Sequence, residues 1–161
     1  MFKVSFKETP NNPSKVVHKA GLGTRVNLKG TVKLPHFWHL MPEEIFDWIT
    51  VQNKVDIYEN MASNCLIIYS EGTSKCMKSD KYDTVFAERL AEARAKYCIY
   101  KFFYDLCSKL YNYYFSIMFG YGTASIAGER GSLGRTLCKY KDLCTRESQH
   151  IVELLKSKDN E

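Results

Sequence analysis

The sequence predicts an α+β fold in which one long helix packs an antiparallel sheet of about four strands, with a C-terminal helical extension. Two observations predict it. Segments of alternating apolar and polar residues fill much of the first half of the chain, and a helical pattern without Gly or Pro runs over 83–119. We expect a core domain at 1–119, followed at 120–161 by a glycine-rich connection and C-terminal helices.

The two strands expected nearest the N-terminus each have one apolar and one basic face. Apolar residues alternate with polar and basic ones over 2–7 and again over 25–34. If these strands pair antiparallel, their cations share one solvent-facing surface: Lys3, Lys7, Arg25, Lys29 and Lys33. Such a face is typical of plain solubility, and it also suits nucleic acid or an acidic protein.

A short helix and a hairpin are expected next. Pro42, followed by Glu43 and Glu44, is typical of a first helical turn. Alternation resumes over 51–57, a turn fits 59–63, and the run 65–69 is continuously apolar. This pattern predicts a hairpin whose second strand is central and covered on both faces, with a bulge or bend at Gly72.

The long helix is expected to begin after Asp83, whose carboxylate can cap its first amides. Apolar residues recur at helical spacing along it, and aromatic residues crowd its second half. Charged residues interrupt them too often for a membrane span. The aromatic row is therefore either core packing or a contact with another chain, including a second copy. In the second case Tyr104, Tyr111 and Tyr114 are the expected anchors.

Five glycines between residues 120 and 134 favour a flexible connection. Within it, Gly131 and Gly134 form a GxxG spacing followed by Arg135, a pattern that can bring backbone amides against phosphates. Arg94, Arg130 and Arg135 are candidate extensions of the basic surface. The remainder, up to about residue 156, predicts one or two amphipathic helices.

Composition excludes several function classes. We expect no signal peptide and no membrane span, and hence a cytoplasmic protein, in the host cell if phage-encoded. Six cysteines without a CxxC pair are expected to be reduced thiols. No nucleophile and base, cofactor fingerprint or metal-ligand set is recognisable, so we expect no enzyme, cofactor or metal site. The net charge of +5 favours anionic partners.

The segment 72–95 resembles one found in small uncharacterised phage and mobile-element proteins. Its matching residues are Gly72, Ser74, Cys76, Lys78, Asp80, Tyr82, Asp83, Ala87, Ala91, Arg94 and Ala95. Ser74, Lys78 and Ala87 stand where that pattern has Ala, Pro and Gly. The resemblance implies a fold like that of double-stranded-RNA-binding domains, in which a hairpin leads into a helix that packs across the sheet. The fold alone does not imply RNA binding.

Two functions are expected from these observations. The first is a non-catalytic phage or mobile-element protein that binds a host protein or ribonucleoprotein, such as an anti-CRISPR-like inhibitor of a defence nuclease. The second is direct binding of RNA or DNA by the basic sheet face. The two are compatible, because a nucleic-acid-binding protein can compete with a nuclease.

Overall fold

The computed structural model describes residues 3–7, 13–34, 38, 41–51, 54–75, 83–121 and 124–159; of residues 117–121, 124–127, 129 and 159 it describes the backbone only. The chain is α+β, as predicted. Its elements, in order, are β1 (Lys15–Ala20), β2 (Gly23–Lys33), α1 (Glu43–Thr50), β3 (Val55–Asn60), β4 (Cys65–Lys75), α2 (Thr84–Tyr121) and α3 (Ala124–Asp159).

The four strands form one antiparallel sheet in the order β1-β2-β4-β3. A two-residue turn joins β1 to β2, and its first residue, Gly21, has a φ of 56°, which a side chain would disfavour. The predicted hairpin of β3 and β4 is confirmed, and β4 is central. Its turn ends at Asn64, which also has a positive φ.

The N-terminal strand prediction was wrong in its placement. Residues 3–7 make a single bridge with the sheet, Ser5 to Thr31, while the strand that pairs with β2 is β1. Strand β1 was not predicted from the sequence because it is an edge strand. Most of its residues are exposed, so apolar and polar residues do not alternate cleanly along it. The segment 3–7 still contributes to packing, since Val4 is buried above Gly30.

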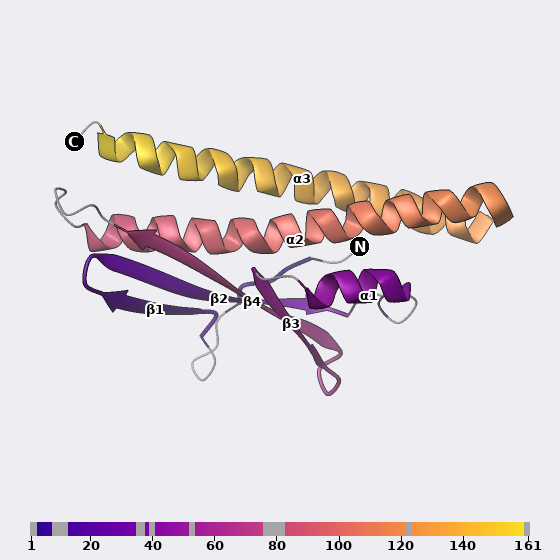
Figure 1. The fold of residues 1–161 in the computed structure, drawn as a ribbon, viewed down its shortest axis with the longest axis horizontal. Helices are drawn as coiled ribbons and strands as arrows, with labels where there is room; N and C mark the ends of the chain where they lie inside the picture. Colours follow the sequence, from indigo (N-terminus) through magenta and orange to yellow (C-terminus); the bar gives the residue numbers. More distant parts are fainter. Residues whose placement is uncertain are drawn as a thin grey trace.

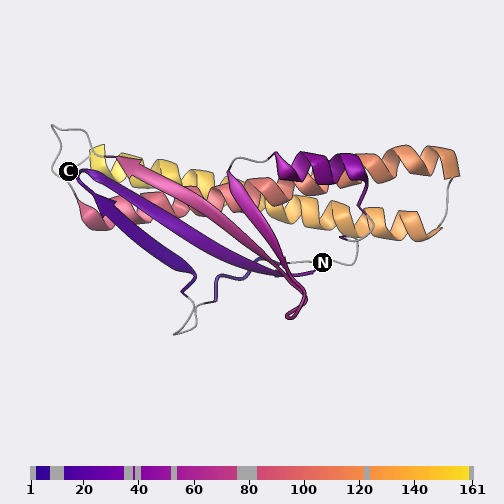
Figure 2. The same cartoon turned by 60° about the horizontal axis from the view of Figure 1, so that its bottom comes forward.

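All three helices lie on one side of the sheet (Figures 1 and 2). Helix α2 crosses the strands, and α1 lies beside it, where Trp48 stacks on Phe102 with ring centroids 5.7 Å apart. The predicted cap of α2 is confirmed: Oδ1 of Asp83 accepts hydrogen bonds from the amides of Val85 (2.8 Å) and Phe86 (3.1 Å). Asp80 lies outside the described residues.

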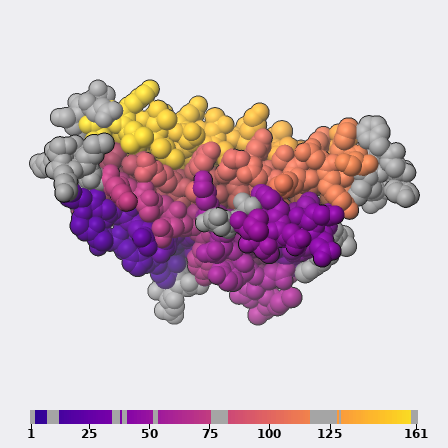
Figure 3. Space-filling view, in the orientation of Figure 1, coloured from indigo at the N-terminus to yellow at the C-terminus, as the bar shows by residue number. Residues whose placement is uncertain are grey.

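Helix α3 begins well before the expected end of the glycine-rich connection. Gly128, Gly131 and Gly134 are helical, so over 124–134 the chain forms a helix in place of the expected flexible loop, and the GxxG spacing lies within it; Gly122 lies outside the described residues. Packing along α2 accounts for this: Leu133 and Tyr140 of α3 are buried with residues of α2, and Gly134 faces the Tyr111 ring, which a Cβ would meet at an ordinary contact distance of 3.5 Å. Figure 3 shows the C-terminal part of α3, in yellow, lying against α2 along the top of the molecule.

The hydrophobic core includes side chains from both segments that the sequence analysis separated at residue 119. Leu133 and Tyr140 of α3 are buried in the same cluster as Phe103 of α2 and Ile68 of β4. The rings of Tyr140 and Phe103 are stacked, with centroids 5.1 Å apart. Burial raises the pKa of Cys107, in this core, to about 12, as expected of a reduced thiol that fills space.

The helix layer and the sheet come very close together at Gly72. The register of β2 and β4 is continuous through Gly72, so the expected bulge is absent. A Cβ on Gly72 would lie 2.7 Å from the amide nitrogen of Ala95 and closer still to the carbonyl oxygen of Ala91. The backbone of α2 therefore rests directly on β4, and only glycine fits beneath it.

We predict that Gly72→Ala lowers the free energy of unfolding by ~3 kcal/mol or more, because the new methyl group meets helix backbone and not a movable side chain. Urea unfolding followed by circular dichroism measures this. Gly128→Ala is the matched control: it lies in a helix with open space around its Cβ, so it should be neutral or stabilising by about 0.5–1 kcal/mol. Equal stability of Gly72→Ala and the wild type would contradict the close crossing.

A candidate binding surface on the open sheet face

The side of the sheet that faces away from the helices carries the candidate site. Along β2 and β4, even-numbered residues such as Val26, Leu28 and Ile68 are buried under α2, so odd-numbered residues point to the other side. We call that side the open face. Its residues include His18 of β1; Arg25, Asn27, Lys29, Thr31 and Lys33 of β2; Asp56 and Tyr58 of β3; and Ile67, Tyr69, Glu71, Thr73 and Lys75 of β4.

Two tyrosines lie exposed on the open face. The expectation that both faces of the 65–69 run would be covered was wrong, because Tyr69 is 38% exposed and Tyr58, on the neighbouring strand, is 57% exposed. Their rings meet edge to face, with centroids 5.8 Å apart. Nζ of Lys29, which is paired with Tyr69 across the two central strands, lies 6.0 Å from the Tyr69 ring centroid. The centre of the open face is thus aromatic and cationic together.

The charge of the open face is predominantly positive. Its cations are Arg25, Lys29, Lys33 and Lys75, and its carboxylates are Asp56 and Glu71. Nε of Arg25 forms an ion pair with Oε2 of Glu71 at 3.3 Å. Both of these side chains are about half exposed, so the pair contributes little and can exchange for another anion.

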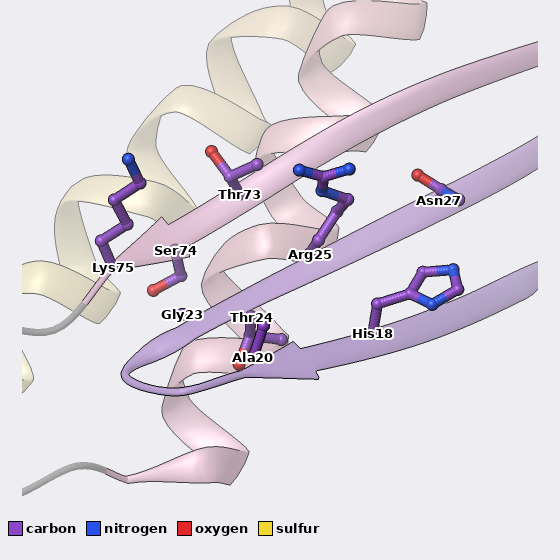
Figure 4. A pocket seen from close by; sticks show the side chains of 9 residues that line it. All are labelled: His18, Ala20, Gly23, Thr24, Arg25, Asn27, Thr73, Ser74 and Lys75. Atoms are coloured by element: carbon purple, nitrogen blue, oxygen red, sulfur yellow. The ribbon is translucent and has the colours of Figure 1, made fainter.

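A pocket of about 490 Å³ lies at the end of the open face where β1 turns into β2. It is lined by His18, Ala20, Gly23, Thr24, Arg25, Asn27, Thr73, Ser74 and Lys75. Figure 4 shows His18, Arg25, Asn27 and Thr73 projecting to one side of three adjacent strands, while Ser74 and Thr24 project to the other. Polar and basic groups from three strands therefore converge at one place.

The predicted basic residues are only partly brought together. Arg25, Lys29 and Lys33 share the open face, as expected. Lys7 is exposed on the N-terminal segment, next to the bridge from Ser5 to Thr31. Burial and the charge of Lys3 lower the pKa of Lys139 on α3, so Lys3 lies near that helix.

The predicted arginines do not extend the open face. Nη1 of Arg94 donates a hydrogen bond to the carbonyl oxygen of Thr73 at 2.7 Å, which ties α2 to β4. Arg130 lies over the rings of Tyr111 and Phe115, 4.8 and 4.5 Å from their centroids, and donates a hydrogen bond to the Tyr111 hydroxyl. Arg135 is exposed on α3, on the helix side of the molecule.

The predicted aromatic anchors pack within the chain. Tyr104, Tyr111 and Tyr114 are half-buried against the hydrophobic core. Tyr111 contacts α3 through Arg130 and Gly134. Packing within the chain thus explains these three tyrosines, while Tyr113 and Phe115 of the same helix remain exposed.

Sequence reasoning missed Tyr58, Tyr69, His18 and Lys75. A signal was present in the sequence: over 65–75, apolar and small residues alternate with Tyr69, Glu71, Thr73 and Lys75. That alternation has the period of a strand with one covered face. The uninterrupted apolar start of β4 concealed it.

Among the described residues, no three His, Cys, Asp or Glu side chains are grouped as metal ligands would be. None of the helices, over the part of the chain that the structure describes, has an apolar stretch that could cross a bilayer. No family model, curated protein or solved structure matches this chain.

An ion-pair cluster fixes β1, and with it His18, against α2. Nζ of Lys15 lies 3.0 Å from Oε1 of Glu88 and 3.2 Å from Oε2 of Glu92, and Lys96 binds the other oxygen of Glu92. The hydrogen bond to Glu88 raises the pKa of Lys15, although burial opposes it. Burial alone would raise the pKa of Glu92, but the hydrogen bonds and charges of Lys96 and Lys15 outweigh it and lower that pKa from 4.5.

We predict that the stability contributed by Glu92 is present in full above pH 4.5 and is lost as the pH falls through its lowered pKa, because the unfolded chain takes up the proton more readily. At pH 7, Glu92→Gln should be less stable than the wild type by at most about 1 kcal/mol, since the cluster is partly exposed. Near pH 3 this difference should shrink. Urea titrations at both pH values measure it.

Glu153→Gln on the exposed surface of α3 is the matched control and should change stability little at either pH. A difference between the wild type and Glu92→Gln that is the same at pH 7 and pH 3 would show that the cluster does not contribute through its charge.

Proposed function

We propose that this protein binds single-stranded nucleic acid across the open face of its sheet. The observation that carries the proposal is the group of Tyr58, Tyr69 and Lys29, which lie on the three adjacent strands β3, β4 and β2 of that face. Bases of a single strand can stack on exposed aromatic rings, and lysines beside the rings can contact the phosphates. The protein supplies both kinds of contact on one exposed surface.

A face that served only solubility would not need these tyrosines. Exposed aromatic side chains on adjacent strands keep apolar area in water, which soluble surfaces generally limit. Val16 of β1 is also 42% exposed, so the apolar area is not confined to the two rings. A bound partner that covers the tyrosines accounts for this exposure.

Single strands fit the surface better than a duplex. The bases of a duplex are stacked on one another, and their faces are unavailable to Tyr58 and Tyr69. The open face also presents strands and not an exposed helix, whereas a helix commonly enters a major groove. The cations lie along β2 at Arg25, Lys29 and Lys33, four residues apart, which suits a backbone that runs along the strand.

An inhibitor of a host nuclease or ribonucleoprotein is compatible with this activity, because a protein that covers single strands competes with enzymes that act on them. The tyrosines expected to anchor a protein partner now have contacts within the chain. Those three tyrosines therefore no longer favour a protein partner. The exposed Tyr58 and Tyr69 favour nucleic acid.

We predict that Tyr58→Ala and Tyr69→Ala each raise the Kd for a fluorescent 12-nucleotide single strand by roughly 5- to 150-fold, since one stacked base contributes about 1–3 kcal/mol. Tyr58→Phe and Tyr69→Phe keep the rings and should bind within about threefold of the wild type. Fluorescence anisotropy measures the affinities. If the alanine variants bind as tightly as the wild type, the tyrosines are not a stacking platform.

We predict further that Lys29→Glu combined with Lys33→Glu weakens binding at every sequence tested and makes it less salt-dependent. Each lost phosphate contact should reduce the slope of log K against log salt by about 0.7. Lys19→Glu combined with Lys141→Glu makes the same charge change away from the open face and should have a smaller effect.

Failure of the wild-type protein to bind any single strand at low salt would overturn the proposed function. Retention of a protein complex from nuclease-treated lysate, with no affinity for oligonucleotides, would identify a protein partner in its place.

A further inference from the structure

We infer that the pocket at the β1–β2 end of the open face holds a terminal nucleotide that carries a phosphomonoester. The inference rests on the proposed function and adds to it a preference for one kind of strand end. It starts from the place where His18, Arg25 and Lys75, each from a different strand, line the same pocket.

The size of the pocket favours a nucleotide over a lone anion. Its volume of about 490 Å³ lies within the range of roughly 300–1,000 Å³ typical of small-molecule sites. A phosphate alone would leave most of that space empty. Ala20 and Gly23, which have the smallest side chains of the lining, keep the pocket wide at the turn.

The charge of the pocket favours a phosphate at a strand end. A phosphomonoester carries about −1.5 to −2 charge at pH 7, compared with one negative charge for an internal phosphodiester. Arg25 and Lys75 supply two fixed positive charges, and Arg25 can form paired hydrogen bonds with phosphate oxygens. Glu71, its present partner, is about half exposed and can be displaced.

The neutral side chain of Asn27 connects the pocket to the tyrosines. Asn27 lines the pocket and lies on β2 between Arg25 and Lys29, and Lys29 is paired with Tyr69. Its amide can both donate and accept hydrogen bonds, as the edge of a base requires. Arg25 and Lys29 are about 13 Å apart along the strand, at ~3.3 Å per residue. A strand whose end lies in the pocket can therefore continue over the tyrosines.

The test uses the full chain and one 12-nucleotide sequence in three forms, with a 5′-phosphate, with a 3′-phosphate, or with hydroxyl groups at both ends. Competition against a fluorescent strand gives each Kd. We expect one phosphorylated form to bind about tenfold more tightly than the hydroxyl form, and the preferred form identifies the end that the pocket accepts.

Lys75→Gln should abolish that preference, because it weakens binding of the preferred phosphorylated form more than it weakens binding of the hydroxyl form. Lys19→Gln is the matched control: Lys19 is exposed and adjoins His18 on β1, but its side chain points to the other side of the sheet, so the preference should remain. Thermal melts of both variants establish that they are folded.

Equal Kd values for all three forms would overturn the pocket assignment while leaving the proposed function intact. A preference that survives in Lys75→Gln would also overturn it. If none of the three forms binds, the proposed function fails, and the pocket assignment fails with it.

Discussion

The structure depends on the close crossing of α2 over β4 at Gly72. There the helix backbone at Ala91 and Ala95 lies directly on the strand, and Arg94 donates a hydrogen bond to the carbonyl oxygen of the next strand residue, Thr73. A glycine in the strand and alanines in the helix leave no side chain that could separate the two layers. The angle and height of α2 above the sheet are fixed by this contact, and α3 is then placed by α2.

This arrangement puts the whole core on one side of the sheet. Side chains from α2, α3 and the inward residues of β2 and β4 fill it, while none of the helices that the structure describes lies over the opposite side of the strands (Figure 2). The ordinary result would be a polar, solvated face. Here Tyr58 and Tyr69 lie exposed side by side on that face, with Lys29 near the Tyr69 ring, and this departure from the ordinary pattern supports the proposal of a binding surface.

The sequence predicted the elements that have strong local signals. Asp83 and the apolar period after it gave the start and length of α2, and the hairpin of β3 and β4 was recognised from alternation and its turn. Strand β1 was missed because an edge strand does not need one apolar face. The early start of α3 was missed because its glycines lower helix propensity, and contacts with α2 override that preference.

The candidate site was predicted only where its residues follow a local sequence pattern. The basic residues of β2 alternate cleanly with core residues, so Arg25, Lys29 and Lys33 were assigned to the correct face. The tyrosines and the pocket required knowledge of which strands are neighbours. Because the open face contributes little to the core, its side chains can be replaced without loss of the fold, and descendants of this chain could acquire new ligands faster than new architectures.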